Sequence, residues 1–376
     1  MAAASTPPQV NPTTTSIPCP PSGPGSVLAW GFGRFGSLGN GRTEKALTPV
    51  KVIGLGKIRS IAAGVDNGYA VRSDRTVVAW GAGSTLGDGR GSNRSTPVKV
   101  AGLSNITEVA SGHHAGYARR SDGLVWAWGR GYDGQLGSDI FSSLIPVQVG
   151  GLSDVKTIAS AANTAFAVRT DGTAWAWGDD GWSTLGNGGE DVSSSVPVPI
   201  SGLTGVSDIA GGGYTGYALV SDGTVWAWGS GVFGTLGPEY LHSAEPVRVP
   251  GLNSITAISA GDYAAYALRA DGTVWAWGDG SRGALGNGEE GRSSVPLQVQ
   301  NLNGVTAIAA ATDGGFALRT DGTVWAWGAG KRGQLGNNGV ADALVPARVP
   351  GLTGITAIAA GASTGYALTG PTTGSG

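Results

Sequence analysis

The sequence predicts an all-β fold, a seven-bladed β-propeller of four-stranded blades, on the basis of three observations. The chain repeats the same landmarks in the same order: Trp-Gly, Leu-Gly, a proline, an apolar run and a Tyr/Phe-Ala run. The Trp-Gly pair occurs seven times, ending at Gly31, Gly81, Gly129, Gly178, Gly229, Gly278 and Gly328. Gly accounts for 68 of the 376 residues, which favours short strands joined by tight turns. Repeated four-stranded sheets of this kind form a propeller.

Each repeat is expected to supply four strands, which we call A to D in chain order. Strand A is an apolar run rich in small residues, such as 255–260, and strand B is the Tyr-Ala-Leu run, such as 266–269. Strand C is Val-Trp-Ala-Trp, such as 274–277, where alternation places Trp275 and Trp277 on one face. Twelve of the 13 Trp residues lie in or beside strand C, so we expect them to pack between blades as core.

Strand D is a Pro-Val-x-Val run that a proline opens. The prolines are Pro49, Pro97, Pro146, Pro197, Pro246, Pro296 and Pro346. A proline and an outward Lys or Arg, such as Lys51 or Arg348, keep an outer edge strand from pairing with other chains. Strand D is therefore expected at the rim of each blade.

The turn between strands B and C is Asp-Gly in five copies, which is the strongest short hairpin signal because both residues tolerate positive φ. The five pairs end at Gly123, Gly172, Gly223, Gly272 and Gly322. One copy has Asp74-Arg75 instead, and we expect a looser turn there.

The chain begins with a strand C at 27–30 and ends with a strand B at 366–368. We therefore expect the first C–D pair and the last A–B pair to share one blade and close the ring. The predicted domains are a disordered Pro/Ser/Thr-rich segment over 1–25, the propeller over 26–369 and a flexible tail over 370–376. Cys19 is expected to be an incidental thiol of the first segment.

These landmarks resemble the repeat of the regulator of chromosome condensation family, whose motifs appear here as Asp321-Gly322, Trp327-Gly328, the Gly-Gln-Leu-Gly of 333–336 and Pro346. The resemblance covers residues 26–369 and implies a seven-bladed propeller closed by mixed termini. It is a weak guide to function, because one fold serves many tasks. Chromatin-bound members promote nucleotide exchange on a small GTPase. In general character this sequence more closely resembles the secreted bacterial members of the family, one of which inhibits β-lactamases through an aromatic-rich face.

The sequence departs from the family in the A–B segment, where members often carry a His. The aligned positions here are Asn67, Ala115, Thr164, Thr215, Ala264, Gly314 and Thr364. The basic tail and wedge loop of the exchange factors are also absent from the sequence, so exchange activity is not expected.

Composition excludes several classes of function. The net charge of −2 gives no basic face for nucleic acid, and no apolar stretch is long enough to span a membrane. A single cysteine excludes an internal disulfide framework. The first 25 residues are no readable signal peptide, but they are typical of a segment that follows a removed one. We therefore expect a secreted or cell-surface protein, with a cytoplasmic location left open.

All length variation between copies lies in the C–D connection. Six proline-to-Trp-Gly intervals are 32 residues each, whereas the intervals from Trp-Gly to the next proline range from 16 to 19. In an antiparallel blade the A–B and C–D connections emerge at one end, which we call the A–B/C–D face. Residue type varies at that face too, with aromatic and Arg side chains of the kind found in binding hot spots. The predicted partner-binding residues are Phe35, Tyr132, Trp182, Tyr214, Phe233, Tyr263, Arg282 and Arg332. Neutral drift on exposed loops is the alternative explanation.

Other motifs carry no chemistry. Gly-x-Gly-x-x-Gly recurs five times, first at 31–36, but Leu-Gly and a polar loop follow it where a dinucleotide site needs a helix. His113 and His114 are adjacent and lack a third ligand, so no metal site is predicted, and no cofactor or catalytic set is recognised.

The sequence thus predicts a non-catalytic interaction protein whose A–B/C–D face binds a macromolecule. A protein partner is favoured, and inhibition of an enzyme is one form that such binding takes. The alternatives are a carbohydrate-binding propeller and a structural component of an extracellular assembly.

Overall fold

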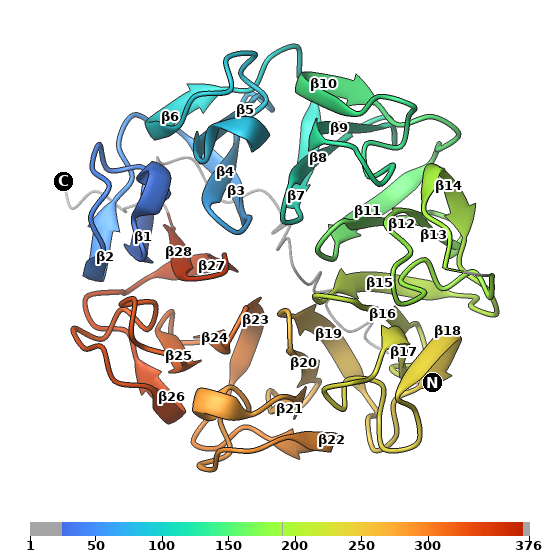
Figure 1. The fold of residues 1–376 in the computed structure, drawn as a ribbon. Helices are drawn as coiled ribbons and strands as arrows, with labels where there is room; N and C mark the ends of the chain where they lie inside the picture. The colour runs from blue at the N-terminus through green and yellow to red at the C-terminus, as the bar shows by residue number, and fades with distance from the viewer. Residues whose placement is uncertain (1–24, 190, 371–376) are drawn as a thin grey trace, which may run out of the picture.

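The four runs of each repeat pair as antiparallel strands, and the resulting sheets stand around one axis (Figure 1). The computed structural model describes residues 25–189 and 191–370. This part forms seven four-stranded sheets, which confirms the predicted seven-bladed propeller. The segments predicted over 1–25 and 370–376, with Cys19, lie almost entirely outside the described residues.

The strands occupy equivalent places in each blade, with strand A next to the axis and strand D at the rim (Figure 1). The A strands are β3 (Ile58–Ala63), β7 (Ile106–Ser111), β11 (Val155–Ser160), β15 (Val206–Gly211), β19 (Ile255–Ala260), β23 (Val305–Ala311) and β27 (Ile355–Ala360). The B strands are β4 (Asn67–Arg72), β8 (Ala115–Arg120), β12 (Thr164–Arg169), β16 (Thr215–Val220), β20 (Ala264–Arg269), β24 (Gly314–Arg319) and β28 (Thr364–Thr369).

The outer half of each blade is equally regular. The C strands are β5 (Val77–Gly81), β9 (Val125–Arg130), β13 (Ala174–Gly178), β17 (Val225–Ser230), β21 (Val274–Gly278), β25 (Val324–Gly328) and β1 (Val27–Gly31). The D strands are β6 (Arg94–Lys99), β10 (Ser142–Gln148), β14 (Ser194–Pro199), β18 (His242–Arg248), β22 (Ser293–Gln298), β26 (Ala343–Arg348) and β2 (Ala46–Lys51). We number the blades from β3–β6 as blade 1 to β23–β26 as blade 6, and the sheet β2-β1-β28-β27 is blade 7.

The seams between blades hold the core. The Trp of each Trp-Gly pair is fully buried and meets the strand-B Tyr or Phe of the preceding blade edge to face, with ring centroids 5.5 to 6.0 Å apart. Its Nε1 donates a hydrogen bond to the carbonyl of the residue before Leu-Gly in that blade, as Trp277 does to Thr235 at 2.9 Å. Trp275 lies on the same side of β21 and is half-buried against the same cluster, so the predicted alternation is confirmed.

Blade 7 closes the ring as predicted, because it joins the two ends of the described chain. β1 lies antiparallel to β28, with Val27 opposite Leu368 and Gly31 opposite Thr364 (Figure 1). The backbone N–H of Ser26 also donates to Oγ1 of Thr369 at 2.8 Å. This arrangement leaves no broken seam in the described ring.

Two sequence expectations were wrong. Each proline lies inside strand D instead of opening it, as Pro296 does in β22. The pairing of β21 with β22 shifts register between Ala276 and Gly278. Proline has no backbone N–H to donate, and it is tolerated at such an irregularity in an outer edge strand.

The Asp74-Arg75 turn is not looser than the others. Arg75 adopts the left-handed φ of 62° that Gly takes in the other copies, and its N–H donates to the carbonyl of Arg72 at 2.9 Å. The Asp74 carboxylate closes the turn by accepting from the N–H and hydroxyl of Thr76.

Candidate functional site

The A–B and C–D connections lie together at one end of the ring, the end that faces the viewer in Figure 1. The three 3-10 turns of the described chain belong to C–D connections at this end. They are η1 (Arg34–Gly36), η2 (Gly83–Thr85) and η3 (Ser281–Gly283). The repeated Gly-x-Gly-x-x-Gly run thus leads into short turns at η1 and η3, and the geometry of a dinucleotide site does not form there.

Two variable positions flank each seam at this end. The first lies three residues before the Leu of Leu-Gly in the C–D connection, and the second lies in the A–B connection of the next blade. Four of these seam pairs are in direct contact. They are Trp182 with Tyr214, Phe233 with Tyr263, Arg282 with Asp313, and Arg332 with Ser363. Residues that the sequence only marked as variable are therefore neighbours in space.

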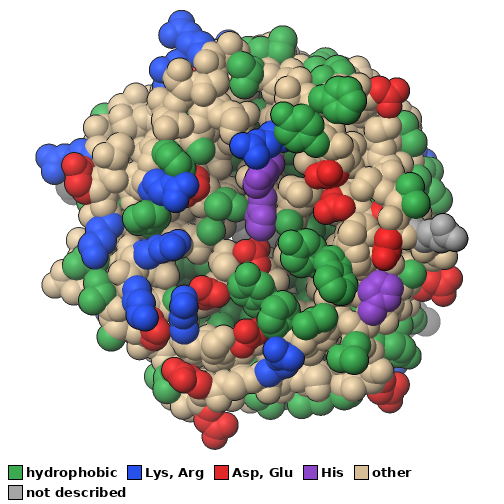
Figure 2. Space-filling model, viewed as in Figure 1, with side chains coloured by type: hydrophobic (Ala, Val, Ile, Leu, Met, Phe, Trp, Pro, Cys, Tyr) green, Lys and Arg blue, Asp and Glu red, His purple; other side chains and the backbone are tan. Residues whose placement is uncertain are grey.

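Two consecutive seam pairs are aromatic, and together with Tyr132 they form what we call the aromatic sector. The Trp182 and Tyr214 ring centroids are 6.4 Å apart, and those of Phe233 and Tyr263 are 4.9 Å apart. Tyr132 is 67% exposed and Trp182 is 51% exposed, although aromatic rings of this size normally bury most of their surface. Figure 2 shows hydrophobic side chains gathered around the centre of this face.

Three of the predicted residues stand in the left-handed backbone region. The φ angles are 60° at Phe35, 71° at Trp182 and 58° at Arg282. A residue with a Cβ pays roughly 1–2 kcal/mol for this conformation relative to the right-handed one. Strained backbone conformations persist only where the surrounding structure fixes them, and they are concentrated at binding and switch sites.

The next two seam pairs carry charge. The Arg282 guanidinium lies 3.1 Å from the Asp313 carboxylate, and Arg332 donates to the Ser363 hydroxyl at 3.1 Å. Burial raises the pKa of Asp313 above its ordinary value, and the charge of Arg282 opposes that rise only in part. Burial, followed by the charges of Asp262 and Asp313, also raises the pKa of Tyr263. In Figure 2, Lys and Arg side chains gather on the left half of the face, where blades 6 and 7 lie.

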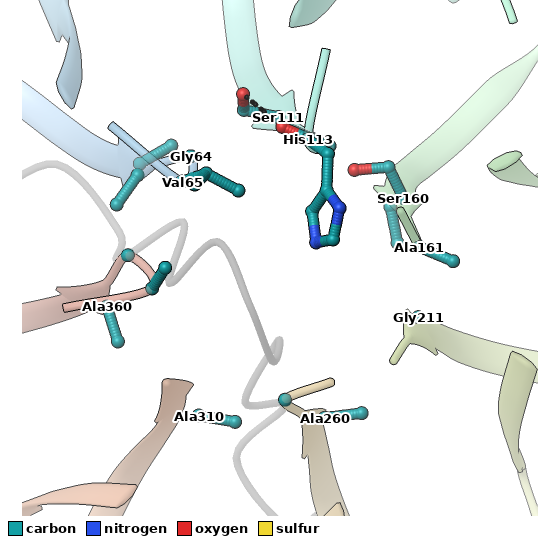
Figure 3. A pocket seen from close by; sticks show the side chains of 18 of the residues that line it. Gly64, Val65, Ser111, His113, Ser160, Ala161, Gly211, Ala260, Ala310 and Ala360 are labelled. Carbon is teal, nitrogen blue, oxygen red and sulfur yellow. Dashed lines mark hydrogen bonds between the residues drawn. The ribbon is translucent and has the colours of Figure 1, made fainter. Parts of the chain in front are cut away.

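The axial opening has a volume of about 130 Å³, and strands A and their loops line it largely with Ala, Gly and Ser. His113 is the one large side chain among the labelled residues, and it points across the opening (Figure 3). Its Nε2 lies 3.2 Å from Oδ1 of Asp262, three blades away, and Thr312 donates to the other Asp262 oxygen at 3.0 Å. The A–B loops are thereby linked across the axis.

A second cavity, which we call the polar hollow, lies beside this opening and has a volume of about 500 Å³. Arg34 and Phe35 of blade 7 form one wall, and Arg130 and His114 of blade 2 form another. Blade 1, which lies between these two blades in the ring, supplies most of the remaining lining, and the hollow shares His113 and Asp262 with the axial opening. Polar side chains complete it, namely Asp66, Asn67, Ser84, Thr85 and Asn93.

The structure places all eight predicted residues in connections at the A–B/C–D face, although their role in binding stays a prediction. Sequence reasoning missed Phe141 and Leu241, which are 72% and 79% exposed. They occupy the same position, just before strand D, in the two copies whose Trp-Gly-to-proline interval is 17 residues. The available signal was an apolar residue five residues before the strand-D proline, a position that Val192 also fills in blade 3 and that is polar at Glu44 and Ser92.

Among residues 25–189 and 191–370, no group of three His, Cys, Asp or Glu side chains is placed to hold a metal ion. His113 and His114, set aside as ligands from sequence, line the hollow instead. The same part of the chain has no helix that is long and apolar enough to cross a membrane.

A model of the regulator of chromosome condensation (RCC1) repeat matches residues 24–71, 122–168, 171–219, 222–268, 271–318 and 321–368. A second model of this repeat matches residues 206–235 and 255–284. The unmatched residues 72–121 include the Asp74-Arg75 turn, and they nevertheless form the same strands. No curated protein matches the sequence significantly.

Three solved structures share the fold. Prp20p from Saccharomyces cerevisiae, described with its binding to Gsp1p and histones, is 24% identical with a TM-score of 0.84, covering 94% of this chain and 93% of its own. Yeast RCC1 (Prp20) bound to Kap60 is 21% identical with a TM-score of 0.84, covering 99% and 94%. Human WBSCR16 is 21% identical with a TM-score of 0.83, covering 93% and 99%.

These comparisons correct the expected location. The prediction of a secreted or cell-surface protein is contradicted, because the similar propellers are intracellular proteins of yeast and human. The bacterial style inferred from the sequence has no support from them either. The Pro/Ser/Thr-rich composition of the first 25 residues was a poor indicator of cellular location, because such a composition does not depend on where a protein resides.

Proposed function

Because the chain belongs to the regulator of chromosome condensation (RCC1) repeat family, we propose that it is a non-catalytic binding protein whose A–B/C–D face holds a protein partner. The main support is the aromatic sector, with its seam pairs Trp182–Tyr214 and Phe233–Tyr263. All of these rings except the half-buried Phe233 are exposed on the ring of blades. Exposed Trp and Tyr anchors on a preorganised scaffold are what protein interfaces use as hot spots.

The backbone strain supports the same role. Trp182 stays in the left-handed region although Gly would relax it, and half of its surface remains exposed. An exposed aromatic residue gains little stability from burial, so folding alone does not account for its presence at a strained position. Binding of a partner would bury the part of the Trp182 side chain that is exposed in the free protein.

The variation between blades favours a protein over a carbohydrate. A propeller that binds sugar rings is expected to repeat its aromatic pocket from blade to blade. Here the seam pairs change from aromatic to ionic to hydrogen-bonded over four consecutive seams. One large asymmetric surface suits a single macromolecular partner. Propellers of similar fold serve the same purpose, since Prp20p is described by its binding to Gsp1p and histones.

Capture of the partner from its native source tests this proposal. The immobilised wild-type protein is expected to retain one specific protein, whereas a variant with Trp182, Tyr214, Phe233 and Tyr263 all replaced by Ala is expected to lose roughly 100-fold or more in affinity. The melting temperature of the variant should stay near that of the wild type, because these rings lie on the surface. A captured enzyme would also be assayed for activity, because coverage of its active site would make the propeller an inhibitor.

A matched control removes apolar surface elsewhere. Ile145, Val196 and Val295 are exposed on outer D strands, and their replacement by Ala should leave capture unchanged. If the aromatic variant binds as well as this control, or if the control loses binding equally, the A–B/C–D face is not the binding surface.

A further inference from the structure

The polar hollow carries an inference that goes beyond the aromatic sector. We propose that it is a carboxylate-binding site that receives an acidic side chain of the protein partner. This inference rests on the proposed function, because the acidic side chain belongs to the protein that the aromatic sector holds. It adds the chemistry of the partner: an acidic segment beside an apolar one.

Two guanidinium groups from separate blades line the same cavity. Arg34 comes from η1 of blade 7 and Arg130 from the end of β9 in blade 2, and both side chains are exposed. Within the described residues, neither has a nitrogen within 4.0 Å of a carboxylate, whereas Arg94, Arg119, Arg120 and Arg282 are all paired in this way. A guanidinium group matches a carboxylate with two parallel N–H donors, so these two are available to a ligand.

The uncharged imidazole of His114 also lines the hollow. Nδ1 of His114 is buried and has no hydrogen-bond partner among the described residues. Burial, and then the charge of Arg130, lowers the pKa of His114 below its ordinary value, so the ring is neutral and keeps one N–H. A buried polar atom without a partner is destabilising, and in the tautomer with hydrogen on Nδ1 a ligand oxygen would supply the missing acceptor.

Both acidic residues of the hollow already interact with other groups of the protein. Asp262 is already engaged by His113 and Thr312. Asp66 is half-buried, which raises its pKa, and it lies in the field of both Arg34 and Arg332. The lining thus holds two arginines, Arg34 and Arg130, and two acidic residues that already interact with other groups of the protein. A partner carboxylate is favoured over an ammonium group for this reason.

Binding of a fluorescein-labelled hexaglutamate peptide tests the site. Fluorescence anisotropy at low ionic strength is expected to show saturable binding to the wild-type protein. The double variant Arg34→Gln/Arg130→Gln should bind at least about 10-fold more weakly, since it loses both charge-assisted donors of the hollow. The control Lys51→Gln/Arg348→Gln changes net charge equally on outer D strands and should bind within about two-fold of the wild type. Equal losses in both variants, or none in the first, would overturn the proposal.

Further arms separate the site from the proposed function. The variant lacking Trp182, Tyr214, Phe233 and Tyr263 should still bind hexaglutamate, because those rings do not line the hollow. If this variant also captures the native partner, the proposed function fails while the carboxylate site stands. If free glutarate competes at the concentration at which the peptide binds, the hollow is a site for a small dicarboxylate, and its assignment to a protein segment is overturned.

Discussion

The indole nitrogen of Trp30 donates a hydrogen bond of 2.9 Å to the carbonyl oxygen of Gln334, across 304 residues of chain. Trp30 belongs to β1 of blade 7, and Gln334 lies in the C–D connection of blade 6. The ring of Trp30 also meets Phe316 edge to face at 5.7 Å. The first described strand is therefore part of the last seam, and the stability of the ring depends on it.

Deletion of residues 26–52, which removes β1 and β2, is expected to abolish cooperative unfolding. The deletion leaves β28 unpaired on one side and removes Trp30 from its seam. Trp30→Ala alone should cost ~3–5 kcal/mol of unfolding free energy, measured by urea denaturation. Trp175→Ala should cost less, because Trp175 is only half-buried. A truncated protein that melted like the full chain would show that closure does not hold the ring.

Trp182→Gly is expected to be more stable than Trp182→Ala by roughly 1 kcal/mol, because Gly removes the left-handed strain that Ala keeps. At Tyr214, whose φ is not positive, the order should reverse, with Tyr214→Ala more stable than Tyr214→Gly. Chemical denaturation of the four variants measures both differences. The same order at the two positions would mean that Trp182 is not strained.

Asp208→Ala is expected to stabilise the protein at neutral pH. Asp208 is 2% exposed in β15, and three other blades carry Ala at the same strand position, at 257, 307 and 357. Burial raises the pKa of Asp208 well above 3.8, with the N–H of Ile209 opposing the rise only in part.

The sign of the pH dependence follows from that shift. The folded state binds the Asp208 proton more tightly than the unfolded state, so its contribution to stability is largest below about pH 3.8 and is lost as pH rises through the folded-state pKa. Urea titrations of the wild type and of Asp208→Ala across this range should diverge as pH rises. A constant difference would show that the pKa of Asp208 is not raised in the folded protein.

The pair of Glu108 and Arg119 should be replaceable by apolar residues. Arg119 Nε lies 2.9 Å from Glu108, and Glu108 also accepts from the Thr157 hydroxyl. Blade 5 carries Ala257 and Leu268 at the same paired positions. Glu108→Ala alone should cost ~3–5 kcal/mol by leaving Arg119 unpaired, whereas Glu108→Ala/Arg119→Leu should be neutral or stabilising. A double-mutant cycle measures the difference, and additive losses would contradict it.

The sequence was sufficient for the fold because each repeat carries its own strand and turn signals. The strand pattern, the blade number and the closure by β1 and β28 were all predicted from landmarks within single copies. The sequence was not sufficient to predict the conformation of Arg75. Its left-handed backbone depends on the hydrogen bonds that Asp74 accepts and on the packing of the hairpin.

The site was predicted only in part. Repeat spacing placed Trp182 and Tyr214 at the same end, but their contact across a seam requires the angle between blades, which no single copy encodes. The polar hollow was missed for the same reason. Arg34 and Arg130 belong to blades that are not consecutive, and only the curvature of the ring directs them to one cavity.

The seam hydrogen bonds have one more consequence. The acceptor of each buried indole is a main-chain oxygen, contributed by Ser37, Thr85, Gln135, Thr184, Thr235, Ala284 or Gln334. A carbonyl is present whatever side chain the residue bears, so point substitutions in the connecting loops leave these anchors in place. Recognition can therefore be rewritten, by natural selection or in the laboratory, without first rebuilding the scaffold that displays it.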